Sequence, residues 1–324
     1  MTEYKEYSKS REIARVNLNI GGIGINPTRP VKWVSGFFMP IYNDNRMLLG
    51  SFPHRMLVTN GFSEVIEKEN IEFDYILGTT SAGIAPASSL ATKYNKPLII
   101  LKDGQAYQLN NYFDSKSAIC HGSTDVIAST IPWGIRDGVT IANKFQKPFM
   151  YVRPAKKDHG KERQIEGILR PGQKVELINI YSGEENNYGN NAVDAILQEG
   201  GITSCVTPVN LNIVKPLDIK GKKVLVIEDL ISYGGSSAKE VETARNLGAV
   251  ADHLISIFTY NFDEAKENFN KLTPKCNAHS ILPYEILLEE AIKTGFLSKD
   301  NEALLIDWRK DPKNWEIKYG FKKI

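Results

Sequence analysis

The sequence is poor in cysteine and has no long apolar run. Only three cysteines stand among 324 residues, and none forms a Cys-x-x-Cys pair. This number and spacing suggest neither a disulfide framework nor a zinc site and are typical of a reducing cytosol. The opening residues, MTEYKEYSKSREIAR, are charged where a secretory signal would be apolar. No run approaches membrane-spanning length. We therefore expect a soluble, cytoplasmic protein without a membrane partner.

Net charge is nearly absent as well. The 40 Lys and Arg residues almost balance the 38 Asp and Glu residues, which leaves a formal charge of +2. Proteins that coat nucleic acid are usually strongly basic, so we expect no nucleic-acid partner. The composition, 42% hydrophobic and 24% charged, is that of a globular protein with one large domain or two small ones.

Short apolar runs alternate with helical patterns along the chain. YILG is followed by a helical pattern and PLIIL, VIAS by a helical pattern and PFMYV, and KVLVIED by a helical pattern and HLISIF. This alternation predicts an α/β fold with a largely parallel sheet.

The chain also contains an internal repeat. Residues 74–102 align without a gap on residues 125–153, and residues 174–200 match residues 223–249. Strand–helix units share binary patterns, which explains some of this likeness. However, charged and proline positions coincide too, so we favour a partial duplication whose middle copy has lost some site residues.

The stretch 223–240, KVLVIEDLISYGGSSAKE, predicts a strand, a glycine turn and a helix. KVLVI suits a strand buried on both faces. Ser237 followed by Glu240 has the spacing of a capping box and predicts the helix start. Ligands of parallel sheets bind at the carboxyl ends of the strands. There, backbone N–H groups, serine hydroxyls and a helix N-terminus suit a phosphate.

Two carboxylates, Glu228 and Asp229, precede this turn. They would repel a phosphate, so they need another function. Carboxylate oxygens accept hydrogen bonds from the neighbouring hydroxyls of a sugar. The stretch therefore predicts a sugar-phosphate site. The alternative is an acidic pair that only solvates a turn, but the combined string is more specific than a glycine pair alone.

The stretch resembles the signature of type I phosphoribosyltransferases for 5-phosphoribosyl 1-diphosphate (PRPP). It is most similar to that of orotate phosphoribosyltransferases. The resemblance implies that Glu228 and Asp229 hold the ribose hydroxyls and that the following turn binds the 5-phosphate. The turn comprises Ser232, Tyr233, Gly234, Gly235, Ser236 and Ser237. Tyr233 departs from the family, where a small residue is usual.

Residues 151–167, YVRPAKKDHGKERQIEG, form a basic segment. Most charge runs are solvated surface loops. This one is similar to the mobile catalytic loop of orotate phosphoribosyltransferases, which closes on pyrophosphate. The resemblance implies that Arg153, Lys157 and His159 contact the leaving pyrophosphate and that Lys156 also binds PRPP.

Residues 78–84, GTTSAGI, follow a predicted strand and resemble the family's pyrophosphate loop. The matching residues, which the resemblance implies bind PRPP, are Thr79, Thr80, Ser81 and Gly83. An ordinary strand–helix turn is the alternative. The middle copy has STIPWGI instead, with Pro132 and Trp133. Proline lacks an N–H donor and tryptophan adds bulk, so we expect no phosphate there.

Residues 26–46 contain SGFFMPIYNDNR, which is similar to the N-terminal hood segment that lines the base pocket in this family. The base-binding residues implied are Phe37, Phe38 and Tyr260. Phe38 and Met39 stand where the family usually has Lys and Ser, and they would suit a flatter or less acidic base. A buried apolar turn is the alternative for Phe38.

The resemblance implies a type I phosphoribosyltransferase fold, a mostly parallel sheet flanked by helices with a hood from both chain ends. To this the repeat adds an extra α/β unit. We predict three parts. Residues 1–108 hold the hood segment and the first half of the core, residues 109–206 the degenerate duplicated unit with the basic loop, and residues 207–324 the PRPP-binding half and C-terminal helices.

The activity implied is transfer of phosphoribosyl from PRPP to orotate in pyrimidine biosynthesis, by a homodimer. Mg²⁺ would be carried by PRPP, with Asp229 contacting it at most through water. The catalytic residues implied are Lys157, His159, Arg153 and Asp229. Two alternatives stay open: another nucleobase as substrate, or a PRPP-binding regulator without turnover. A regulator needs no leaving-group clamp, so the basic loop speaks against it. Whether that loop acts within one chain or across a dimer also stays open.

Overall fold

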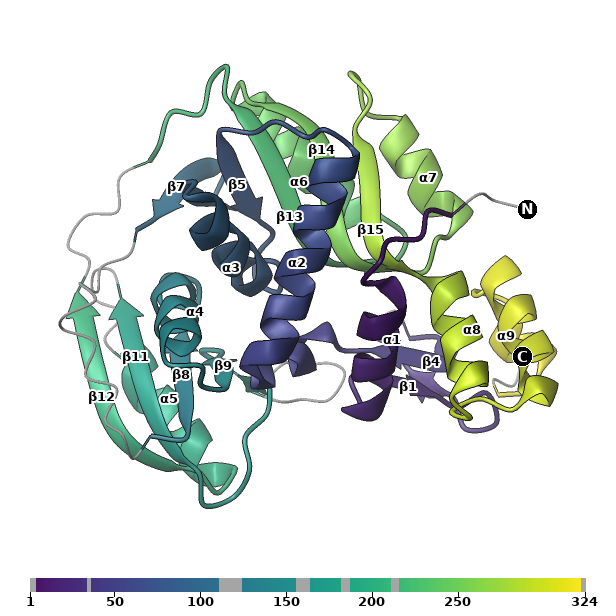
Figure 1. Cartoon of the computed structure of the whole chain (residues 1–324), viewed down its shortest axis with the longest axis horizontal. Coiled ribbons are helices and arrows are strands. Elements are labelled where there is room, and N and C mark those ends of the chain that lie inside the picture. The colour runs from purple at the N-terminus through teal and green to yellow at the C-terminus, as the bar shows by residue number, and fades with distance from the viewer. Residues whose placement is uncertain are drawn as a thin grey trace.

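The computed structural model describes residues 4–33, 36–110, 124–155, 164–181, 187–210 and 216–321. They form two β-sheets with helices between and around them, and a cap of helices and short strands at one side (Figure 1). In these ranges no helix is both long enough and apolar enough to cross a membrane.

The first sheet has six strands. Their order is β15 (Asn277–Pro283), β14 (Val250–Thr259), β13 (Lys223–Ile231), β5 (Tyr75–Gly78), β6 (Leu98–Lys102) and β7 (Gln105–Leu109). Neighbouring strands are parallel except β7, which is antiparallel to β6. The predicted strands at YILG, PLIIL and KVLVIED are confirmed. These apolar runs are buried because helices cover both faces of the sheet.

The second sheet has five strands in a similar arrangement. Its order is β12 (Ile202–Asn210), β11 (Lys174–Tyr181), β8 (Val126–Thr130), β9 (Phe149–Val152) and β10 (Ile165–Glu166). Again only the last strand, β10, is antiparallel to its neighbour. The prediction of a mostly parallel α/β fold is confirmed, and the middle part of the chain has a sheet of its own. Strand β12 continues to Asn210, past the predicted boundary at residue 206.

Matching hydrogen bonds fix the central strand pair in both sheets. In the first, the Asp74 carboxylate accepts from the Lys223 N–H at 2.9 Å, and the Asp74 N–H donates to the Lys223 carbonyl at 2.8 Å. In the second, Asp125 and Lys174 make the same pair of bonds, both at 2.8 Å. The internal likeness therefore extends from sequence to strand order and register.

One hydrophobic cluster extends across both sheets, and each sheet has a further cluster on its other face. Helices α2 (Phe52–Lys68) and α3 (Ile84–Tyr94) cover one face of the first sheet, and α6 (Gly235–Asn246) and α7 (Asp263–Asn270) cover the other. On the second sheet, α4 (Ile135–Lys144) and α5 (Asn187–Gln198) lie on opposite faces. The aligned helices α3 and α4 pack against each other between the sheets, so both units bury apolar residues in the same cluster.

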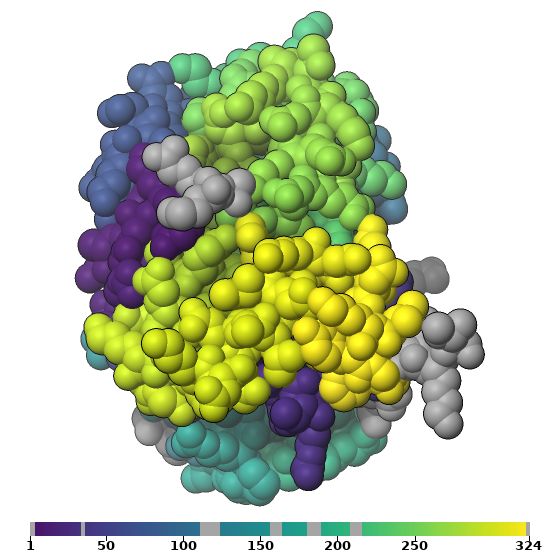
Figure 2. Space-filling view, turned by 90° about the vertical axis from the view of Figure 1, so that its right-hand side faces the viewer, coloured from purple at the N-terminus to yellow at the C-terminus, as the bar shows by residue number. Residues whose placement is uncertain are grey.

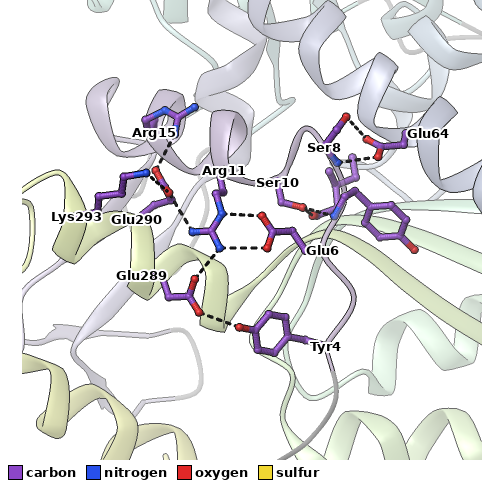
Figure 3. Close-up of polar contacts among 12 residues, drawn as sticks. Tyr4, Glu6, Ser8, Ser10, Arg11, Arg15, Glu64, Glu289, Glu290 and Lys293 are labelled. Carbon is purple, nitrogen blue, oxygen red and sulfur yellow. Dashed lines mark hydrogen bonds and ion pairs between the residues drawn. The ribbon is translucent and has the colours of Figure 1, made fainter.

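The hood combines both ends of the chain. It contains α1 (Ser10–Asn19), β1 (Ile23–Ile25), β2 (Val31–Lys32), β3 (Phe38–Met39), β4 (Ile41–Asn43), the 3-10 helix η1 (Asn45–Gly50), α8 (Tyr284–Lys293), α9 (Lys299–Lys310) and α10 (Trp315–Lys318). Figure 2 shows the N-terminal and C-terminal segments on one face. Arg11 and Arg15 of α1 hold the buried carboxylate of Glu290 on α8, at 3.1 and 2.8 Å (Figure 3).

Arg55 on α2 joins the first unit to the second. Its side chain is 3% exposed and donates to the carbonyls of Leu49 and Lys147 at 2.6 and 2.7 Å. It also donates to Asn143 Oδ1, at 2.8 Å, on the last turn of α4. Burial lowers the pKa of Arg55 to about 10, so it stays charged at neutral pH. A cation there also suits the negative end of the α4 dipole.

Replacing this arginine is expected to destabilise the whole chain. Arg55→Met leaves three acceptors without a donor, and each buried unpaired acceptor costs about 1–3 kcal/mol. We expect the free energy of unfolding in urea to fall by roughly 3 kcal/mol. The control is Arg29→Met at an exposed position, which should change it by less than about 0.5 kcal/mol. Equal stability of the two variants would contradict this role.

Candidate active site

The predicted phosphate turn lies at the carboxyl end of β13. Ser232, Tyr233 and Gly234 follow the strand, and Gly235, Ser236 and Ser237 form the first turn of α6. Gly234 has a φ of 76°, and a Cβ there would lie 3.1 Å from Ala265 Cα. Only glycine suits this position. Within the described residues the buried Ser232 hydroxyl has no hydrogen-bond partner, so it is available to a ligand.

The capping-box prediction is wrong. Helix α6 begins at Gly235, two residues before Ser237, and no side chain caps it. Ser237 Oγ instead donates to Glu228 Oε2 at 3.0 Å. The Ser237 hydroxyl, which the local pattern predicted to cap the helix, therefore makes a tertiary contact instead. The first N–H groups of α6 are left for another acceptor, as a phosphate would be.

Glu228 ties three segments of the site together. Its carboxylate accepts from Thr79 Oγ1 at 2.8 Å, from Ser237 Oγ at 3.0 Å and from the Asp229 N–H at 2.8 Å. Burial raises the pKa of Glu228, and these hydrogen bonds oppose the rise. Both carboxylate oxygens thus accept hydrogen bonds from protein donors.

The segment 78–84 lies beside this carboxylate, between β5 and α3. A Cβ at Gly83 would lie 2.4 Å from the Ile227 carbonyl, so glycine allows the loop to pack closely on β13. The Thr80 hydroxyl donates to the Leu101 carbonyl at 3.3 Å. The structure therefore brings the predicted loop at residues 79–83 next to the acidic pair.

Asp229 is the more available member of that pair. Burial raises its pKa to about 7; the charge of Arg46 opposes this rise, while the charges of Glu228 and Asp44 add to it. The backbone of Asp229 is fixed by Asn45, whose side-chain amide donates to its carbonyl at 3.0 Å. Asp229 is therefore poised to change charge near neutral pH.

The second sheet contributes Arg153 to the same site. Arg153 follows β9, and its Nη2 donates to Ser81 Oγ at 3.3 Å. Its Nε donates to Glu166 Oε1 at 2.7 Å. The same oxygen pairs with Arg46 Nη1 at 2.6 Å, and Arg46 also pairs with Asp44.

Sequence reasoning did not single out Arg46, Asp44 or Glu166, although all three lie within motifs quoted for the resemblance. A local pattern does not reveal an ion pair between residues more than 100 positions apart. The predicted residues Lys156, Lys157 and His159 lie outside the described residues.

The corresponding loop of the second unit carries a buried tryptophan, Trp133. Thr130 Oγ1 donates to Asn179 Oδ1 at 3.2 Å, which matches the bond from Thr79 to Glu228. Trp133 is only 5% exposed and lies edge-on to Tyr107, with ring centroids 5.7 Å apart. The expectation that no phosphate binds there remains a prediction.

Aromatic rings connect the phosphate turn to the hood. Tyr233 stacks on Phe262 with centroids 5.0 Å apart, and Phe262 stacks on Tyr260 at 5.4 Å. Tyr260 is 1% exposed and contacts Trp33 and Trp308. The unusual Tyr233 therefore extends an aromatic cluster that holds the turn against the hood.

In the hood motif, two residues differ from the family pattern, Phe38 and Met39, and their surroundings are different. Phe38 is partly exposed on β3, and its N–H donates to Glu316 Oε2 at 2.7 Å. Met39 is fully buried, with Trp308 Nε1 lying 3.1 Å from its sulfur. Met39 is therefore a core residue, whereas Phe37 and Phe38 keep partial exposure.

No group of three or more His, Cys, Asp or Glu side chains suited to a metal occurs among the described residues. Asp229 offers one carboxylate at the site. Magnesium commonly binds through one or two carboxylates together with substrate phosphates and water. The side chains present thus fit an ion that arrives with its substrate.

Comparison with known proteins identifies the class. No family profile matches the chain. The chain is 24% identical over 309 residues to the orotate phosphoribosyltransferase of Coxiella burnetii, covering 95% of this chain and 99% of the relative. It is 28% identical over 299 residues to that of Phocaeicola vulgatus, covering 92% and 93%. The crystal structure of orotate phosphoribosyltransferase from Aeropyrum pernix superposes with a TM-score of 0.46 at 17% identity, covering 88% and 99%.

The full-length sequence similarity and the turn after β13 define the chain as a phosphoribosyltransferase. It belongs to the type I family, and the sequence relatives it matches here are orotate phosphoribosyltransferases.

The raised pKa of Asp229 predicts a pH-dependent stability. Above the unfolded pKa near 3.9, the unfolded chain loses this proton while the folded chain keeps it until about pH 7. The folded state is therefore penalised as pH rises from 4 to 7. We expect Asp229→Asn to raise the free energy of unfolding by at least about 1 kcal/mol at pH 8 but not at pH 4.

The measurement is urea unfolding of the ligand-free protein at both pH values. Asp194→Asn, an exposed position on α5, is the control and should show no such difference. An equal effect of Asp229→Asn at pH 4 and pH 8 would show that the carboxyl is not perturbed.

Proposed function

We propose that the protein is an orotate phosphoribosyltransferase. It would transfer the 5-phosphoribosyl group of PRPP to a ring nitrogen of orotate, giving orotidine 5'-phosphate and pyrophosphate. The observation that supports this most is the convergence of three segments at one edge of the first sheet. These are the turn after β13, the loop after β5 and Arg153 from the second sheet.

The turn and the acidic pair would hold the phosphoribosyl part of PRPP. The unpartnered Ser232 hydroxyl and the N–H groups at the start of α6 suit the 5-phosphate. Because Glu228 already accepts from Thr79 and Ser237, Asp229 is the better acceptor for the ribose hydroxyls. Glu228 then holds Asp229 and the two loops in place.

The leaving pyrophosphate would lie between the β5 loop and the second sheet. Breaking the C1–O bond gives C1 positive character and moves negative charge onto the pyrophosphate. Arg153, aimed at Ser81, can stabilise that charge together with Lys156 and Lys157. His159 or Lys157 would donate a proton to the leaving oxygen. Mg²⁺ carried by PRPP would neutralise further phosphate charge, with Asp229 contacting it through water.

Phe37 and Phe38 of the hood would line the base pocket, and Tyr260, which follows β14 and is buried in the aromatic cluster, would support it. Because Met39 is buried against Trp308, its difference from the family pattern does not alter a pocket surface. This favours orotate. The second candidate is transfer to another nucleobase, which the partly exposed ring of Phe38 supports.

The direct test is the loss of orotate absorbance on mixing the protein with orotate, PRPP and Mg²⁺. We expect turnover by the wild type and a fall of roughly 100-fold in Asp229→Asn, because an amide cannot replace the charge of the carboxylate. Glu72→Gln, which removes an exposed ion pair with Lys223, should keep full activity.

Other outcomes separate the alternatives. PRPP binding by calorimetry without orotate consumption would transfer the proposal to another nucleobase, to be sought by a nucleobase screen, or to a PRPP-binding regulator. Absence of PRPP binding would contradict all of these functions.

A further inference from the structure

The edge of the second sheet enters the site of the first. Strands β9 and β10 are antiparallel, with Val152 opposite Ile165 and Tyr151 opposite Glu166. The pairing continues one residue further, because the Arg153 N–H donates to the Gln164 carbonyl at 2.9 Å. Strand β9 of this hairpin contacts η1 of the hood. Its register places Arg153 and Glu166 close together.

Glu166 is a buried carboxylate between two guanidinium groups. It is 5% exposed, and its Oε1 is 2.7 Å from Arg153 Nε and 2.6 Å from Arg46 Nη1. Burial lowers the pKa of Arg46, but the charges of Asp44 and Glu166 outweigh this, and the net direction is upward. Removing one partner of such a buried cluster leaves charge without compensation. The geometry of each arginine therefore depends on Glu166.

Arg153 crosses from one unit to the other. It belongs to the second sheet, yet its Nη2 reaches Ser81 of the loop after β5 in the first. Arg46, the other guanidinium on Glu166, comes from the hood and opposes the rise in the pKa of Asp229 by its charge. A single carboxylate of the second unit thus orients two cations toward the site of the first.

In the described part of the second unit, the residues that match the site of the first are different. Asn179 stands where the first unit has Glu228, so the sugar-binding carboxylate is absent. Trp133, in the loop that corresponds to residues 79–83, is buried against Tyr107. Among the described residues the second unit therefore gives Arg153 to the site of the first, although its five strands are ordered like five of the six strands of the first sheet.

We propose that the second unit is an internal partner that completes the site of the first within the same chain. Arg153 is the leaving-group-binding residue that it supplies, and Glu166 is the positioning residue that orients Arg153 and Arg46. Each chain then holds one complete site and needs no second copy. This inference rests on the proposed function.

The role of Glu166 is tested by a double-mutant cycle. We expect Glu166→Gln to lower kcat roughly 10–100-fold with little change in the KM for orotate, because Arg153 is misplaced. Arg153→Ala should lower it at least as much. The double variant should lose much less than the product of the two single losses, since Glu166 acts in part through Arg153.

Glu290→Gln is the matched control. Glu290 is also a buried carboxylate between two arginines, Arg11 and Arg15, but it lies between α1 and α8, away from the site (Figure 3). A general loss of buried charge would affect both variants alike. Equal losses of kcat in the two, or additive losses in the cycle, would overturn the positioning role.

Completion within one chain is tested by dilution and by mixing. Activity per chain should stay constant as the wild type is diluted until mass photometry shows monomers only. Mixing Arg153→Ala with Asp229→Asn chains should recover no activity. A fall in activity as the chains dissociate, or recovery on mixing, would overturn the proposal.

Failure of the proposed function can be recognised separately. If the wild type binds PRPP but does not consume orotate, the same cycle is measured as PRPP affinity by calorimetry. Non-additive losses there would support the internal partner even though orotate is the wrong substrate. Additive losses would overturn it.

Discussion

The ion pairs of Glu166 with Arg46 and Arg153 are the contact on which the arrangement of the site depends. They join the hood, the second sheet and the loop after β5 at one buried carboxylate. Arg153 contacts Glu166 through Nε and Ser81 through Nη2, so one guanidinium joins this cluster to the loop. The shared core of α3 and α4 and the hydrogen bonds of Arg55 bring the units into contact. The ion pairs of Glu166 then place the Arg153 guanidinium of the second unit at the candidate site of the first.

Inside the first unit a second carboxylate, Glu228, has the corresponding function. It accepts hydrogen bonds from Thr79, from Ser237 and from the backbone of Asp229, and so fixes the distance between the phosphate turn and the neighbouring loop. Its neighbour Asp229 is left near its point of ionisation. One acid thus organises the site while the other can change charge, a difference produced by hydrogen bonding and burial.

Local features of the sequence predicted local parts of the structure. The strand at residues 223–231 and the glycine turn after it follow from an apolar run and from residues with little steric restriction. The start of α6 was misplaced because the Ser237 hydroxyl binds Glu228, a contact set by the tertiary fold. The burial of Met39 and the role of Glu166 were likewise not predictable. Each depends on a partner that is remote in the sequence.

The central claim is that groups from both units bind the same ligand in one chain. It is tested most directly by the affinity for PRPP with Mg²⁺, measured by calorimetry in Ser81→Ala, Arg153→Ala and the double variant. Because both side chains would contact one pyrophosphate, the account predicts that the double variant loses at least about threefold less affinity than the product of the single losses. Independent losses that multiply would contradict it.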